Sequence, residues 1–209
     1  MAVVWLHGLG DFGDGWKGAF DDVEGRVRGV KFYHPDAPEA PVSIQDDEET
    51  TSWFNLKTWP IDLSEPEDPA GLEDSVKRIH GMLDQIESSG TPSNRIILGG
   101  FSQGGTLSLL AGLSYPKKLG GIVAISGWLA IRKGMDARIH EANKSTPVLY
   151  CYGSKDPVVD VSLTKACGGM LESLMGDAVS VMPVRRGMHQ PDGSEMQAAS
   201  DFMIRHLSA

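Results

Sequence analysis

Short apolar runs alternate with longer amphipathic segments along this chain. The apolar runs cover residues 2–6, 30–33, 95–98, 121–126, 147–152 and 178–184. Runs this short and this apolar predict strands that are buried on both faces of a sheet. Because helix-like segments separate them, the alternation predicts an α/β fold whose mostly parallel central sheet is covered by helices on both faces.

The amphipathic segments predict the helices of this fold. Within residues 69–89, apolar side chains recur at spacings of three and four, at Leu72, Val76, Ile79, Leu83 and Ile86. This spacing places them on one face of a helix. Further helices are expected between Ser102 and Pro116, over residues 162–175 and over residues 193–207.

Residues 34–68 form the longest stretch with neither pattern, and they are rich in Pro, Asp and Glu. An irregular segment of this length in a compact domain is often a lid or a binding loop. No change of composition marks an internal boundary. We therefore expect residues 1–209 to form a single domain.

Charge and composition narrow the class of protein. The formal net charge is −9, and basic residues are adjacent in pairs at most, which argues against nucleic acid and against anionic lipid surfaces as partners. The apolar run at residues 2–6 is far too short for stable membrane insertion. Cys151 and Cys167 make no disulfide framework, so a reduced, cytoplasmic setting is expected.

The clearest chemical signal is the sequence Gly-Phe-Ser-Gln-Gly at residues 100–104. It lies between a predicted strand and a predicted helix, which is the context of the nucleophile elbow. The turn is strained, so the positions that flank the serine must be nearly free of side chains. Ser102 is therefore the predicted nucleophile.

A serine nucleophile needs a histidine base and an orienting carboxylate, which follow it in the order acid, then histidine. Asp156 and His189 come shortly after the last two apolar runs, at the strand ends where open α/β sheets place their sites. Asp160 is the rival acid but lies further from the strand. The other histidines considered precede the serine or lie in helical segments: His7, His80, His140 and His206.

Two backbone N–H groups are needed to stabilise the oxyanion. Gln103, directly after the serine, is expected to supply one of them. Leu9, in the glycine-rich segment that follows the first strand, is expected to supply the other. The same segment continues to Gly13 and matches G-x-G-x-x-G, with Asp36 further on, so a dinucleotide-binding interpretation is also available. It leaves the serine, the acid and the histidine unexplained.

Six blocks occur in order along the chain: His7-Gly8-Leu9-Gly10-Asp11, Ser52-Trp53-Phe54, Gly99-Gly100-Phe101-Ser102-Gln103-Gly104-Gly105, Ser126-Gly127-Trp128, Gly153-Ser154-Lys155-Asp156-Pro157 and Gly187-Met188-His189. Together they resemble the acyl-protein thioesterase, lysophospholipase and carboxylesterase family of small α/β-hydrolases. The resemblance extends from residue 2 to the C-terminus. It implies the α/β-hydrolase fold, the Ser102–Asp156–His189 triad and the oxyanion hole at Leu9 and Gln103.

The resemblance also implies the reaction, which is hydrolysis of acyl thioesters or esters without a metal or other cofactor. S-acylated proteins are the implied substrates, in a depalmitoylation-type reaction, and at most a weak homodimer is expected. A general carboxylesterase or lysophospholipase that acts on small or lipid esters is the alternative. A non-catalytic binding protein with a hydrolase fold is a third hypothesis, against which the intact set of Ser, Asp and His argues.

One segment departs from the family pattern. Residues 45–51 read Gln-Asp-Asp-Glu-Glu-Thr-Thr, where relatives are apolar or glycine-rich. Carboxylates are costly to desolvate, so we expect this loop at the pocket rim, facing water. The wall of the acyl site is expected at Trp53, Leu63, Trp128 and Met188, although each of these could equally belong to the core.

Overall fold

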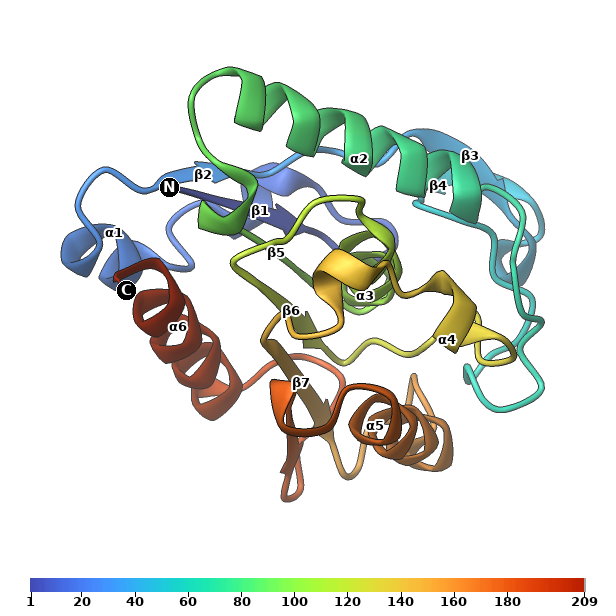
Figure 1. The fold of residues 1–209 in the computed structure, drawn as a ribbon. Helices are drawn as coiled ribbons and strands as arrows, with labels where there is room; N and C mark the ends of the chain where they lie inside the picture. The colour runs from blue at the N-terminus through green and yellow to red at the C-terminus, as the bar shows by residue number, and fades with distance from the viewer. Residues whose placement is uncertain (209) are drawn as a thin grey trace.

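The computed structural model describes residues 1–208, and Ala209 lies outside the described part. Its centre is a six-stranded sheet in the order β2-β1-β5-β6-β7-β8, in which every neighbouring pair is parallel (Figure 1). The strands are β1 (Ala2–Leu6), β2 (Lys31–Tyr33), β5 (Ile96–Phe101), β6 (Gly121–Ile125), β7 (Val148–Gly153) and β8 (Val179–Val184). The predicted parallel sheet is therefore confirmed.

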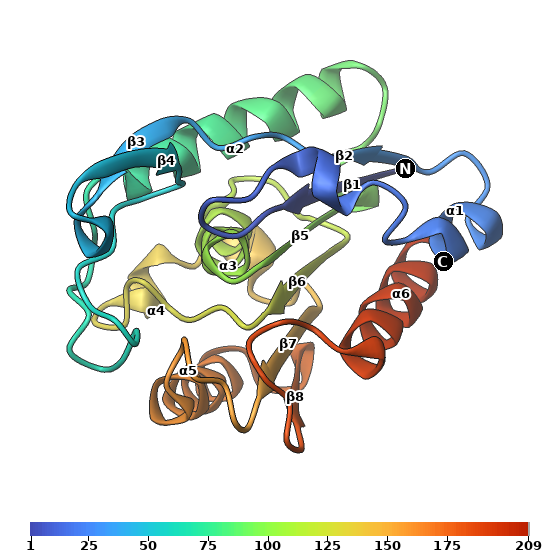
Figure 2. The same ribbon diagram turned by 180° about the vertical axis from the view of Figure 1, so that it is seen from behind.

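Helices cover both faces of this sheet. They are α1 (Asp21–Arg26), α2 (Leu72–Ser88), α3 (Gln103–Ser114), α4 (Met135–Arg138), α5 (Val161–Met175) and α6 (Gly193–Ser208). Helices α2, α3 and α5 share one apolar core with the sheet, whereas α1 and α6 pack together against the opposite face (Figure 2). Within residues 1–208, no helix combines the length and the apolarity needed to cross a membrane.

Strand β1 shows why polar and apolar residues do not alternate within the short apolar runs. All five of its residues are fully buried. Val4 and Leu6 point into the core shared with α2, α3 and α5, while Val3 and Trp5 point into the core beneath α1 and α6. A strand between two helical layers needs an apolar side chain at every position, because successive side chains point to opposite faces.

The segment predicted to be irregular, residues 34–68, contains a two-stranded antiparallel hairpin. Its strands are β3 (Glu39–Val42) and β4 (Glu48–Thr51), joined through the 3₁₀ turn η2 (Ser43–Gln45). The hairpin was missed because it stands apart from the main sheet and most of its side chains are exposed, so it lacks an apolar stripe. The helices α1 and α4 were missed because each is too short to show a clear amphipathic repeat.

The core predicts a clear difference between two positions on α2. Leu83 is fully buried against the central layer, and Gln85 is exposed two residues later. We expect Leu83→Ala to lower the free energy of unfolding by about 2–5 kcal/mol. Gln85→Ala should change it by less than about 0.5 kcal/mol. Equilibrium unfolding in urea measures both, and equal effects would contradict this packing.

Candidate active site

Ser102 lies at the sharp turn between β5 and α3. Its φ of 54° and ψ of −119° fall outside the regions that a serine ordinarily adopts. The close packing of the turn explains the flanking glycines, because a Cβ atom at Gly104 would lie 2.2 Å from the carbonyl oxygen of Leu6. The elbow therefore presses the first turn of α3 against the end of β1.

A continuous hydrogen-bonded chain connects the three predicted catalytic residues. The Nε2 atom of His189 lies 2.9 Å from the Oγ of Ser102, and its Nδ1 lies 2.8 Å from Oδ2 of Asp156. When Nδ1 carries the proton and donates it to the carboxylate, Nε2 is free to accept the serine proton. The arrangement can therefore increase the nucleophilicity of Ser102.

The carboxylate of Asp156 is held at both oxygens. Its side chain is shielded from solvent, and its Oδ1 accepts hydrogen bonds from the backbone N–H groups of Val158 and Val159, at 2.7 and 3.0 Å. The rival Asp160 instead accepts a hydrogen bond from the N–H of Ser162 at the start of α5. Hydrogen bonds from Ser162 lower the pKa of Asp160. The structure thus brings Asp156, rather than Asp160, to the histidine.

The loop that carries His189 is anchored from two directions. Ser126, which follows β6, donates its hydroxyl to the carbonyl oxygen of His189 at 2.8 Å. The ring of Phe101 packs on the imidazole with the ring centroids 5.0 Å apart. Because Phe101 directly precedes Ser102, this contact fixes the imidazole against the elbow itself.

Burial raises the pKa values of two titratable side chains outside the hydrogen-bonded chain, Glu195 and Cys151. Burial raises the pKa of Glu195 above its usual range, and one of its carboxylate oxygens accepts a hydrogen bond from the N–H of Asp192 at 3.0 Å. This contact joins Asp192, three residues after His189, to the first turn of α6. Burial also raises the pKa of the Cys151 thiol to about 12, so Cys151 does not compete as a nucleophile.

The segment after β1 lies directly against the elbow. A Cβ atom at Gly8 would be 3.4 Å from the Cβ of Ser102. Within residues 1–208, the backbone N–H groups of Leu9 and Gln103 donate to no protein acceptor. Two unpaired donors beside a serine hydroxyl, one of them at a helix N-terminus, can bind a developing oxyanion.

The side chain of Gln103 has a role that sequence reasoning missed. Its Oε1 accepts a hydrogen bond from the N–H of Trp53 at 2.8 Å, and its Nε2 donates to the Oγ of Ser52 and the carbonyl of Phe54, at 3.0 and 2.6 Å. The indole Nε1 of Trp53 donates to the carbonyl of His7 at 2.9 Å. The Ser-Trp-Phe block is therefore hydrogen-bonded both to the elbow and to the loop that follows β1. No local sequence pattern pairs residues fifty positions apart.

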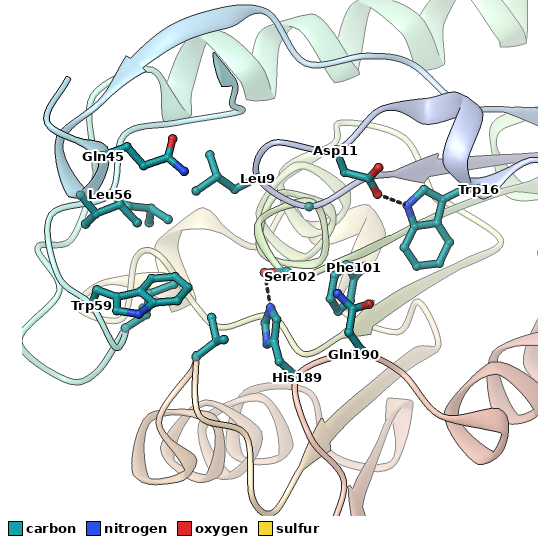
Figure 3. Close-up of a pocket in the computed structure, with 14 residues that line it drawn as sticks. Leu9, Asp11, Trp16, Gln45, Leu56, Trp59, Phe101, Ser102, His189 and Gln190 are labelled. Carbon is teal, nitrogen blue, oxygen red and sulfur yellow. Dashed lines mark hydrogen bonds between the residues drawn. The ribbon is translucent and has the colours of Figure 1, made fainter. Parts of the chain in front are cut away.

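A pocket of about 450 Å³ contains Ser102 and His189. In Figure 3, Leu9, Leu56 and Trp59 lie with Gln45 on one side of this pair, and Asp11 and Gln190 lie with Trp16 and Phe101 on the other. Its lining residues are Gly8, Leu9, Asp11, Trp16, Ile44, Gln45, Leu56, Trp59, Ile61, Phe101, Ser102, Val158, His189 and Gln190. This volume and lining suit a small organic substrate.

None of the four residues expected to form the acyl wall lines this pocket. Trp53 and Trp128 are buried in the core, each 1% exposed. Leu63 lines a separate hollow beside Arg132, and Met188 points outward from the histidine loop. The expectation is corrected: the apolar wall consists of Leu9, Ile44, Leu56, Trp59, Ile61 and Val158. Several of these come from residues 44–61, within the irregular stretch whose length indicated a lid or a binding loop but whose pattern did not single out individual residues.

The acidic segment behaves as expected from the cost of burying carboxylates. Asp46, Asp47, Glu48 and Glu49 are all exposed on the hairpin turn and the start of β4. Gln45, at the near end of the segment, lines the pocket. The acidic side chains therefore face water beside the rim.

The dinucleotide-binding interpretation does not fit the structure. After β1 the chain enters the short 3₁₀ helix η1 (Gly13–Trp16), not the long helix that this fingerprint opens. Asp36, the expected ribose ligand, accepts a hydrogen bond from the N–H of Gly13 at 2.7 Å.

Within the described residues, no group of three or more His, Cys, Asp or Glu side chains is arranged to hold a metal ion.

Comparison with known proteins extends these observations. A family profile described as phospholipase/carboxylesterase matches residues 1–207. Acyl-protein thioesterase 1 of Gibberella zeae is 39% identical over 179 residues, which is 82% of this chain and 76% of that protein. The structure of Arabidopsis thaliana SOBER1 superposes with a TM-score of 0.92 at 28% identity over 99% of each chain. Acyl-protein thioesterase 2 of Zea mays superposes at 0.81 and 26% identity, over 99% of this chain and 93% of that one.

The chain belongs to the phospholipase/carboxylesterase family of α/β-hydrolases. The family resemblance seen in the sequence is thereby confirmed. The chain is accordingly a serine hydrolase of esters or thioesters rather than a binding protein that has lost catalysis.

The tight elbow predicts a contrast between two helical glycines. Gly104→Ala would place a methyl group against the Leu6 carbonyl, whereas a Cβ atom at Gly169 on α5 has no neighbour within 4 Å. We expect Gly104→Ala to lower kcat/KM by about a hundredfold or more, because it displaces the nucleophile. Gly169→Ala should keep full activity and stabilise the protein by up to about 1 kcal/mol. Esterase kinetics and thermal unfolding of both variants measure this, and an active Gly104→Ala protein would contradict the close approach.

Proposed function

We propose that this enzyme cleaves acyl thioesters and esters through a covalent acyl-enzyme on Ser102. In this proposal His189 is the general base and acid, and Asp156 orients its imidazole. The observation that carries the proposal is the hydrogen-bonded chain from Ser102 through His189 to Asp156 beside a partly apolar pocket. The family membership of the chain supports the same reaction class.

The proposed reaction proceeds in two halves. Nε2 of His189 takes the proton as the Oγ of Ser102 attacks the acyl carbonyl. The negative oxygen is then bound by the N–H groups of Leu9 and Gln103. As the carbon–sulfur or carbon–oxygen bond breaks, the imidazolium returns its proton to the departing thiol or alcohol. Water repeats the cycle on the acyl-enzyme and releases the acid.

We further propose S-acylated proteins as substrates, which corresponds to removal of S-acyl groups. The printed name of the Gibberella zeae relative, acyl-protein thioesterase 1, supports this choice. Small or lipid esters are the second candidate. The exposed carboxylates of residues 46–49 beside the pocket rim are unlike an apolar surface that would bind a long acyl chain.

Substitutions in the hydrogen-bonded chain test the proposed catalytic roles. Ser102→Ala should abolish hydrolysis and labelling by a fluorophosphonate probe. Asp156→Asn should lower kcat by about 10⁴-fold, because the imidazole loses the partner that sets its tautomer. Asp160→Asn is the matched control and should stay close to wild type, since Asp160 caps α5. A larger loss in Asp160→Asn than in Asp156→Asn would overturn the assignment of the acid.

The apolar half of the pocket predicts the acyl preference. A buried methylene contributes about 0.8 kcal/mol, but the whole pocket holds about 450 Å³, and the exposed residues Asp46–Glu49 directly follow Gln45 in its lining. We expect short and medium acyl groups to be preferred over palmitoyl. Ile44→Trp, which fills the apolar half, should lower kcat/KM for an octanoyl thioester by about tenfold while sparing the acetyl thioester.

Ile131→Trp is the matched control for this experiment. Ile131 is also partly buried against the same core, but it lines the separate hollow beside Arg132. Its substitution should leave the chain-length profile unchanged. The assignment of the apolar half fails if the two variants shift the profile equally, or if the wild type strongly prefers palmitoyl.

A further inference from the structure

The pocket is chemically divided at the nucleophile. In Figure 3, Leu9, Leu56 and Trp59 lie to one side of the Ser102–His189 pair, and Asp11, Trp16 and Gln190 lie to the other. Ile44, Ile61 and Val158 also line the pocket. We group them with the first half, because the N–H of Ile44 donates to the carbonyl of Leu56, Ile61 follows Trp59 closely in the chain, and the N–H of Ile61 donates to the carbonyl of Val158. The lining of the first half is apolar apart from the exposed Gln45. The second half holds a carboxylate, an amide and an indole, together with the phenyl ring of Phe101.

Asp11 introduces a fixed negative charge into the polar half. Its Oδ1 accepts a hydrogen bond from the N–H of Phe12 at 2.8 Å, and its Oδ2 accepts one from Nε1 of Trp16 at 3.1 Å. A carboxylate has room for further hydrogen bonds at both oxygens. Within residues 1–208, no lysine, arginine or histidine forms an ion pair with Asp11. The charge at this end of the pocket is therefore uncompensated by a cationic side chain.

Aromatic contacts fix this charge relative to the reacting atoms. The ring of Trp16, which donates to Asp11, packs on Phe101 with the centroids 5.7 Å apart. Phe101 in turn packs on His189. Asp11 is thus tied through two ring contacts to the imidazole, and it does not sit on a freely moving surface loop.

We propose that Asp11 is a specificity-determining residue that selects the leaving group by charge. The apolar half takes the acyl chain, because a hydrocarbon chain gains free energy only where water is displaced by apolar surface. The departing thiol or alcohol then occupies the polar half, on the other side of Ser102. This inference rests on the acyl-enzyme reaction proposed above and names the substrate class of the same site.

Asp11 should favour leaving groups that carry a positive charge or N–H donors near the scissile bond. A cysteine of a polypeptide flanked by lysine or arginine meets this description. A leaving group with a phosphate or carboxylate close to the ester, such as that of a lysophospholipid, is disfavoured by like-charge repulsion. Among the candidate substrates, the proposal therefore favours S-acylated basic peptides.

The test uses butyryl thioesters of three thiols of different charge: thiocholine is cationic, N-acetylcysteamine is neutral and mercaptoacetate is anionic. For the wild type, kcat/KM should be about five- to twentyfold higher for the cationic than for the anionic thiol. This ratio should decrease at high ionic strength. Asp11→Asn keeps the shape of the side chain but removes its charge. Because the intrinsic reactivities of the thiols are the same for both proteins, the substitution should lower the cationic-to-anionic ratio by about five- to twentyfold relative to the wild type.

Two control variants separate charge from structure. Asp14→Asn makes the same change of net charge three residues away, at an exposed side chain that pairs with Lys17 outside the pocket, and it should leave the ratio unchanged. Trp16→Phe removes the indole donor but keeps the carboxylate charge. Whatever its overall rate, it should retain the preference for the cationic thiol.

A fourth substrate tests the direction of binding. A succinyl thioester of N-acetylcysteamine carries its negative charge on the acyl side, so Asp11→Asn should not improve it relative to the butyryl thioester. Improvement of the succinyl substrate alone would reverse the two halves and overturn the proposal. An unchanged charge ratio in Asp11→Asn, or equal loss of the ratio in Asp14→Asn, would overturn it as well. Failure of the underlying reaction would appear separately, as thioester turnover that survives Ser102→Ala.

Discussion

The close approach of α3 to the end of β1 is the constraint on which the site depends. Because Gly104 presses against the Leu6 carbonyl, the strand that leads into Ser102 and the strand that leads into the loop of Gly8 and Leu9 must lie side by side. They do so as the parallel pair β1–β5. The buried amide of Gln103 then ties both to the Ser-Trp-Phe segment. Any side chain at position 104 would open this junction.

The remaining polar groups reach the site because all strands run in one direction. Asp156 follows β7 and His189 follows β8, and these neighbouring strands end at the same edge as β5 and β6. Ser126, at the end of β6, holds the carbonyl of His189. The packed parallel sheet therefore fixes the positions of the loops at one of its edges, and the polar residues of the site lie on these loops.

The two halves of the pocket arise from different parts of the fold. The apolar half is built largely from the segment around η2 and residues 56–61, which has little regular structure. The polar half combines Asp11 and Trp16, from the loop after β1 and from η1, with Gln190 from the loop that carries His189. Most of the pocket lining therefore comes from residues outside the hydrogen-bonded chain of Ser102, His189 and Asp156.

The sequence alone determined the parallel sheet, because strands buried on both faces must be apolar throughout, as in residues 2–6. It also placed Ser102, Asp156 and His189 at strand ends, since glycine spacing and residue order are local features. Tertiary structure decided between Asp156 and Asp160, because only the fold shows which carboxylate reaches the imidazole. It likewise removed the four expected wall residues, Trp53, Leu63, Trp128 and Met188, from the pocket. An exposed or buried apolar residue looks the same in a sequence until packing determines which surface it faces.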